Sequence, residues 1–156
     1  MELTRTSVAE AMAEAIAEVL ENTAFMEVLP GLPEDDPTRN EAVYYTRLPI
    51  YKPAPSTVGL VIPLSLALSL ANAMLMKECD ADEDEFQVMD VLSELTNMLA
   101  GSLLTHLLAD LDSFELGLPE CHVITDPANN QEWEDCQVFE FQADGLGFSC
   151  LWLGTR

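Results

Sequence analysis

A carboxylate, a carboxamide and a glycine recur at helical spacing near the middle of the chain. Asp90, Glu94, Asn97 and Gly101 follow one another at intervals of four, three and four residues. At about 100° per residue, these positions fall within a stripe roughly 60° wide on one side of a helix. Because side chains three residues apart on a helix are neighbours, Glu94 and Asn97 can act on the same small target.

The residues around this stripe predict that the same helix has a packing side. Gln87 and Thr105 extend the polar stripe by about one turn at each end. The opposite side carries apolar residues that we expect in the core, namely Val88, Val91, Leu92, Leu95, Met98, Leu99 and Leu103. The pattern therefore predicts a helix over about residues 84–108 with one narrow polar face.

Two interpretations of the polar stripe remain open at this point. Most polar stripes on helices simply face water. Asn97, however, is a poor residue for a helix interior, and Gly101 costs a helix roughly 1 kcal/mol relative to Ala. Two weak helix formers on one narrow face favour the second interpretation, in which another molecule approaches the helix closely.

The sequence around the stripe resembles a known signature. The run Asp90-Val-Leu-Ser-Glu94-Leu-Thr-Asn97-Met-Leu-Ala-Gly101 is similar to the motif of the CheC/CheX-type chemotaxis phosphatases. In that motif Asp or Ser, then Glu, then Asn recur at this spacing, and a Pro follows further along the chain. Here Pro119 comes one residue earlier than in that pattern. The order of elements from about residue 56 to 156 also fits, with a hydrophobic helix before the motif and a β-hairpin at the end.

The resemblance implies a role for each position of the motif. Asn97 would orient the water that attacks the aspartyl phosphate of a CheY-like response regulator, and Glu94 would contact the regulator's active-site lysine. Asp90 would support them, and Gly101 would let the backbone of the regulator approach. Mg²⁺ would belong to the regulator, so we expect this chain to bind no metal or cofactor of its own.

Members of the CheC/CheX-type family differ in whether they carry one or two copies of this motif. On the first predicted helix, Glu14, Glu18 and Asn22 come closest to a second copy, but Glu18 and Asn22 are four residues apart instead of three. With a single motif the chain resembles the CheX type, whose members work as homodimers. The resemblance therefore implies a homodimer whose partner is a phosphorylated response regulator.

The sequence also bears on function classes other than a phosphatase. An autonomous hydrolase is disfavoured because the sequence has no Gly-x-Ser-x-Gly elbow and no cluster of metal ligands. A non-enzymatic module that binds regulators or flagellar-switch proteins is the main alternative, although the presence of both Glu94 and Asn97 favours activity. A calcium or small-molecule sensor is suggested only by the acidic run at residues 78–85 and the apolar helix before it.

The acidic run matches a calcium-binding loop only in part. Asp80, Asp82 and Asp84 have the spacing of the first half of an EF-hand loop. The sixth and twelfth positions would then be Glu85 and Val91, where that loop requires Gly and Glu. We therefore interpret the run as acidic residues at the start of the motif helix, where the helix dipole favours negative charge.

The composition restricts the partners and the location of the chain. Twenty-eight acidic and six basic residues give a net charge of −22. A surface this negative repels nucleic acids and anionic membranes, so neither partner is expected. The length of 156 residues predicts one domain spanning 1–156. Because the first residues lack a basic run followed by an apolar core, we expect a cytoplasmic protein.

The cysteines and histidines give weaker signals. The four cysteines lack C-x-x-C spacing, so reduced thiols are expected, and a metal site built from Cys121, His122 and Cys136 is a weak alternative. We interpret His106 as a structural residue on the core side of the motif helix.

The remaining pattern predicts an α+β domain with a mainly antiparallel sheet and about three long helices packed on it. The apolar stretch at 58–76 approaches transmembrane length, but Pro63 and its polar residues favour a strand that runs into a buried helix. We expect roughly five or six strands in total. The first predicted helix starts at a capping box formed by Ser7 and Glu10 and ends near residue 22, and two more helices are predicted at 64–77 and 84–108. Strands are predicted at 41–51, 57–62, 113–118, 136–142 and 146–153, with shorter candidates at 25–29 and 121–125.

Overall fold

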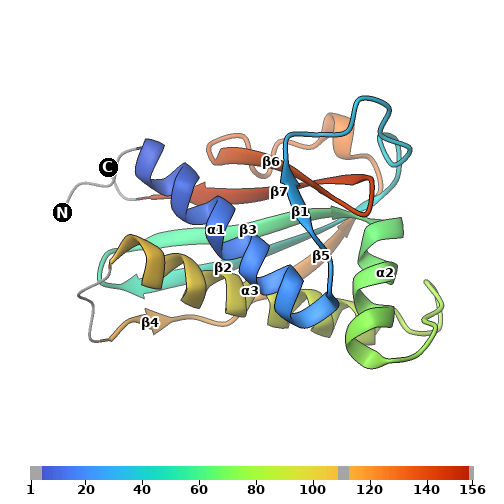
Figure 1. Cartoon of the computed structure of the whole chain (residues 1–156), viewed down its shortest axis with the longest axis horizontal. Helices are drawn as coiled ribbons and strands as arrows, with labels where there is room; N and C mark the ends of the chain where they lie inside the picture. Colours follow the sequence, from blue (N-terminus) through green and yellow to red (C-terminus); the bar gives the residue numbers. More distant parts are fainter. Residues whose placement is uncertain (1–4, 109–112, 155–156) are drawn as a thin grey trace.

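The computed structural model describes residues 5–108 and 113–154, and within these ranges seven strands form one antiparallel sheet (Figure 1). The strand order is β1-β6-β7-β3-β2, and β4 and β5 follow one another along the outer edge of β2. The predicted antiparallel sheet is confirmed. The strands are β1 (Val28–Pro30), β2 (Val43–Lys52), β3 (Ser56–Pro63), β4 (Glu115–Leu116), β5 (Glu120–Ile124), β6 (Gln137–Ala143) and β7 (Leu146–Leu153).

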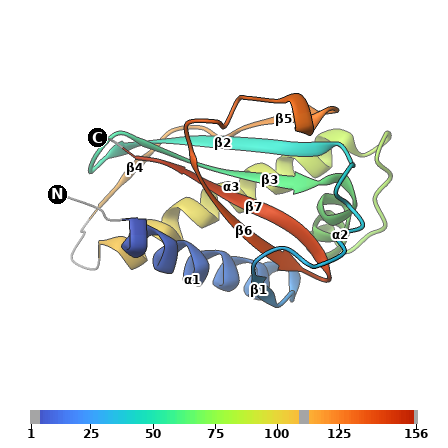
Figure 2. The ribbon, with the colours of Figure 1, turned by 90° about the horizontal axis from the view of Figure 1, so that it is seen from above.

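Three α-helices accompany the sheet in the described part of the chain: α1 (Arg5–Ala24), α2 (Leu64–Leu75) and α3 (Glu85–Leu107). Helices α1 and α3 run side by side on one face of the sheet, and α2 stands at the end of the sheet (Figures 1 and 2). This is the predicted α+β arrangement. A short 3-10 helix (Pro127–Asn129) lies on the opposite side of the sheet from α1 (Figure 2).

Several boundaries differ from the sequence-based expectation. Ser7 lies inside α1 instead of preceding it, so the predicted capping-box start is wrong. The strand expected at 113–118 shrinks to two residues, and the one expected at 25–29 begins at Val28. The apolar stretch at 58–76 divides into β3 and α2 as predicted. In the described residues, no helix combines the length and the apolarity needed to span a membrane.

The core lies between the sheet and the two long helices. Alternate residues of the strands point toward α1 and α3 and are buried with the apolar sides of these helices. Phe148 and Trp152 of β7 belong to this layer, as the sequence predicted. The buried strand residues of the core are Tyr44, Leu48, Ile50, Val58, Leu60, Ile62, Phe139, Phe141, Ala143, Phe148, Cys150 and Trp152.

Strands β6 and β7 form a hairpin, as the turn residues Asp144 and Gly145 predict. Asp144 and Gly145 both have positive φ, at 56° and 77°, and Ala143 pairs with Leu146 across the turn. A two-residue connection with both φ values positive has the right twist for adjacent antiparallel strands. Strands β2 and β3 form a second hairpin, also as expected.

A chain of buried hydroxyl groups connects α3 to the sheet. The backbone N–H of Leu60 donates to the Thr46 hydroxyl at 3.0 Å, and the hydroxyls of Thr46 and Thr96 are 2.6 Å apart. Thr96 in turn donates to the carbonyl oxygen of Leu92 at 2.8 Å. Since Thr96 uses its only proton there, Thr46 must donate to Thr96. Both threonines are completely buried, and Thr96 immediately precedes Asn97.

We predict that Thr96→Val destabilises the fold by about 1–3 kcal/mol, although the two side chains have nearly the same shape. The change leaves the buried Thr46 hydroxyl without its acceptor, and an unsatisfied buried donor carries a desolvation cost of that size. Urea unfolding of the two proteins measures the difference. Equal stability of the variant would show that the hydroxyl chain does not hold α3 in place.

Candidate functional site

Helix α3 presents the polar stripe to solvent. The side chains of Asp90, Glu94 and Asn97 are exposed, and Gly101 is half-buried. Met98 is 38% exposed, so its predicted place in the core was wrong. The reason is geometric: Met98 lies only about 40° from Glu94 around the helix and borders the stripe. The rest of the predicted packing side is buried, namely Val88, Val91, Leu92, Leu95, Leu99 and Leu103.

The side chains of Glu94 and Asn97 have no partner in the part of the chain that the structure describes. Among the described residues, no hydrogen bond or ion pair engages either side chain. Between them, Leu95 and Thr96 are fully buried, so the backbone that carries the pair is fixed to the core. The arrangement offers a carboxylate and a carboxamide on a rigid support, with all of their hydrogen-bonding capacity available to another molecule.

The outer positions of the stripe make contacts of their own. Gln87 accepts a hydrogen bond from Lys77 at 3.1 Å, and Thr105 donates to the carbonyl oxygen of Gly101 at 2.9 Å. Asp90 lies near Cys121 of β5. Burial, and to a lesser degree the negative charge of Asp90, raises the pKa of the Cys121 thiol to about 12. This cysteine therefore stays protonated at neutral pH. Because Gln87 and Thr105 already make hydrogen bonds within the chain, their side chains are less available to a partner than those of Glu94 and Asn97.

The space above Gly101 is partly occupied by the chain itself. A methyl group added at Gly101 would lie 3.8 Å from the ring of Phe114, which is an ordinary van der Waals contact. Phe114 is 42% exposed and sits just before β4. Gly101 is thus not required by the packing of the described chain.

The carboxylates of α1 are used in packing against α3. Glu14 and Glu18 each lie 3.0 Å from a different ring nitrogen of His106, and Ser102 donates to Glu18 at 3.0 Å. The hydrogen bonds from His106 and Ser102 lower the pKa of the Glu18 carboxyl below its ordinary value. His106 is therefore a structural residue of the α1–α3 contact. Glu14 and Glu18, which came closest to a second motif in the sequence, are used in this contact.

The acidic run before α3 also has local partners. The Asp80 carboxylate accepts hydrogen bonds from the backbone N–H groups of Asp82 and Glu83. The Asp84 carboxylate accepts from the backbone of Asp80 and pairs with Lys77 at 3.1 Å. These contacts fold the run into a compact turn that leads into α3. Among the described residues, no group of three or more His, Cys, Asp or Glu side chains is arranged to hold a metal ion.

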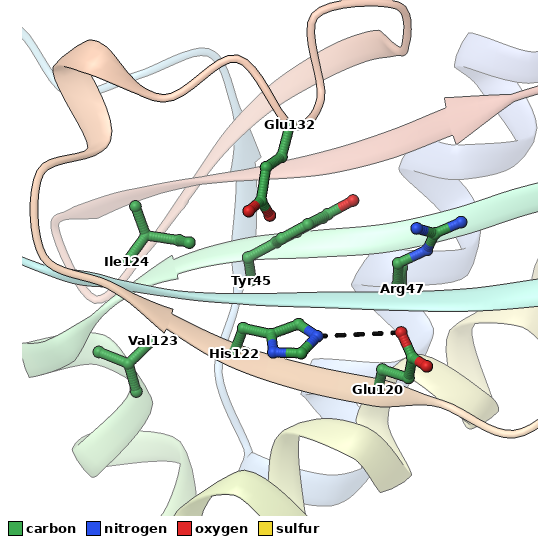
Figure 3. Close-up of a pocket in the computed structure, with 7 residues that line it drawn as sticks. All are labelled: Tyr45, Arg47, Glu120, His122, Val123, Ile124 and Glu132. Carbon is green, nitrogen blue, oxygen red and sulfur yellow. Dashed lines mark ion pairs between the residues drawn. The ribbon is translucent and has the colours of Figure 1, made fainter.

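A shallow pocket of about 480 Å³ lies on the other face of the sheet (Figure 3). Tyr45 and Arg47 line it from β2, and because Thr46 between them points toward α3, the sheet separates the pocket from the motif. Trp133 packs on Tyr45 with ring centroids 5.1 Å apart. No pattern in the sequence indicates this contact. The lining residues are Tyr45, Arg47, Glu120, His122, Val123, Ile124 and Glu132.

Comparison with protein families matches residues 49–142 to the family described as chemotaxis phosphatase CheX. The chain belongs to this family. The matched segment contains all of α3 and therefore the whole polar stripe. The CheX match places the chain among chemotaxis proteins of the phosphatase type, as its signature predicted. No curated protein sequence matches the chain.

Solved structures share the fold over almost the whole chain. CheX from Vibrio vulnificus is 16% identical with a TM-score of 0.74, covering 97% of this chain and 99% of that one. CheX from Desulfovibrio desulfuricans is 17% identical with a TM-score of 0.72, covering 95% and 99%. CheX of Borrelia burgdorferi, solved as a complex with CheY, BeF₃ and Mg²⁺, is 19% identical with a TM-score of 0.67, covering 94% and 97%. At these identities the likeness establishes the CheX fold.

We predict that Gly101→Ala raises the free energy of unfolding by about 0.5–1 kcal/mol, because Ala is the better helix former and the space is sufficient. Thermal unfolding measures this gain. If Gly101 is kept for the approach of a partner, the stabilised variant should bind that partner more weakly. A destabilised variant would show that the added methyl group is not accommodated beside Phe114.

Proposed function

We propose that this chain accelerates the dephosphorylation of a CheY-like response regulator, with Asn97 orienting the attacking water and Glu94 contacting the regulator's active-site lysine. One observation carries the proposal: in a member of the CheX family, Glu94 and Asn97 are exposed, have no partner among the described residues, and lie on a helix whose backbone is fixed to the core. The presence of CheY in the B. burgdorferi CheX structure supports a partner of the same kind here.

The chemistry requires little from this chain beyond positioning. A phosphorylated receiver domain carries the aspartyl phosphate and a lysine, and its own Mg²⁺ neutralises charge on the phosphoryl oxygens. What remains is to hold a water in line with the bond that breaks. A carboxamide can accept one hydrogen bond from that water and donate another to a neighbouring oxygen, so Asn97 can fix both its position and its orientation.

Glu94 fits a role in orienting the partner. Its carboxylate has no pairing group among the described residues, and an opposite charge on an incoming lysine provides one. Asn97 follows Glu94 at a spacing of three residues, so an ion pair at Glu94 brings the reacting phosphoryl group to the same side of the helix. Asp90, one turn before Glu94, adds negative charge beside this contact and is proposed as a supporting residue.

We predict that Asn97→Ala lowers the acceleration of phosphate release by at least about 100-fold, because the water loses its positioning group. Phosphate release from a phosphorylated CheY-like receiver domain with Mg²⁺ is measured with and without each protein. The matched control is Asn22→Ala, which removes an exposed asparagine from α1 and should leave the rate unchanged.

The outcomes separate the candidate functions. An Asn97→Ala variant that folds normally and retains full activity would contradict the positioning role. Binding of the phosphorylated receiver without acceleration by the wild type would instead support a non-enzymatic regulator-binding module.

We further propose that the chain acts in the cytoplasm as a homodimer. The described sheet ends in β1 on one side and in β4 and β5 on the other, and open edges of this kind can pair with a second copy. Sedimentation equilibrium at micromolar concentration is expected to give twice the monomer mass. A monomer mass at those concentrations would contradict the dimer.

A further inference from the structure

Two exposed apolar side chains of α3 border the polar stripe. Phe86 is 82% exposed and Met98 is 38% exposed. Around the helix axis Phe86 lies about 20° beyond Asn97, and Met98 lies about 40° beyond Glu94 on the other side. Single exposed apolar residues are common on protein surfaces. These two differ because they enclose the stripe between them on the same rigid helix.

Phe86 is close enough to the stripe to share one interface with it. It precedes Glu94 by eight residues, which corresponds to about 12 Å along the helix axis. A typical protein interface covers about 800 Å² on each partner, a patch of about 16 Å radius. A partner centred on Glu94 would therefore reach Phe86. Burying the exposed ring of Phe86 would remove a large apolar surface from water, and aromatic residues are frequent anchors of interfaces.

The charge next to Phe86 selects the kind of partner. Asp82 and Glu83 are exposed just before α3, and no contact between described residues engages their carboxylates. Their backbone N–H groups are held by Asp80, so the two side chains are presented from an ordered turn. The nearby Lys77 is already paired with Asp84. This end of α3 is thus acidic with an apolar centre, and it is complementary to a basic surface that carries an apolar residue.

We propose that Phe86 and Met98, with the carboxylates of Asp82 and Glu83, form a docking rim for a basic surface beside the phosphorylation site of the receiver domain. The proposal rests on the proposed function of Glu94 and Asn97. The rim contributes to the affinity for the partner equally before and during the reaction. It therefore lowers KM without changing kcat, whereas Asn97 acts on kcat.

The test compares variants on the receiver domain that the wild type dephosphorylates. Phe86→Ala is expected to raise KM about tenfold with kcat unchanged, and Phe86→Leu to recover most of the loss. The same variant should weaken binding of the receiver loaded with beryllofluoride and Mg²⁺ about tenfold, a readout that does not depend on turnover. Phe25→Ala is the matched control, because Phe25 is 85% exposed at the end of α1.

A charge variant tests the second part of the rim. Asp82→Asn combined with Glu83→Gln is expected to raise KM and to reduce its dependence on salt, because exposed charges that steer association are screened by ions. An unchanged salt dependence would remove these carboxylates from the rim.

These experiments distinguish a failure of the docking rim from a failure of the proposed function. If the wild type does not accelerate phosphate release, the proposed function is wrong. If the wild type is active and Asn97→Ala is not, but Phe86→Ala matches the wild type in KM and in binding, the docking rim is wrong and the function stands. A Phe86→Ala variant that changes the sedimentation mass would assign the surface to a second copy of the chain and overturn the proposal.

Discussion

The position of the candidate site depends on how α3 is rotated on the sheet, and buried hydroxyl groups define that rotation. Apolar packing alone is compatible with small rotations of a helix, because dispersion and burial have little directional preference. The buried hydrogen bond between Thr46 and Thr96 joins β2 to α3, and a rotation that broke it would leave the Thr46 hydroxyl without an acceptor. Since Thr96 is the neighbour of Asn97, this bond helps to keep the Asn97 side of the helix toward solvent.

The two long helices use similar side chains for opposite purposes. On α1, Glu14 and Glu18 pair with His106 and hold the helix against α3. On α3, Glu94 has no such partner among the described residues and remains available. Both helices carry carboxylates at helical spacing, so the difference comes from what stands opposite each carboxylate. Among the described residues, Glu14 and Glu18 are therefore engaged between the helices, whereas Glu94 remains without a partner beside Asn97.

The strong negative charge of the chain is consistent with a protein that completes the active site of another molecule. An acidic protein that bound a free phosphate ester would need basic residues around it, and six basic residues against twenty-eight acidic ones leave few for this purpose. In the function proposed above, a receiver domain supplies its own lysine and metal ion, so a carboxylate and an amide are sufficient contributions from this side. The docking proposal adds the acidic turn before α3 to partner recognition.

The existence of the three helices, the two hairpins and the solvent-facing stripe on α3 could be predicted from the sequence, because each depends on periodicity or turn chemistry within a few residues. Met98 was predicted in the core but is exposed. It lies at the edge of the polar stripe, where helical spacing alone does not decide between core and solvent. The sequence did not reveal that Thr46 meets Thr96 or that Trp133 covers Tyr45. Nor did it show that His106 joins two carboxylates of α1. These contacts join residues far apart in the chain, and only tertiary packing brought them together and decided which polar side chains stay free.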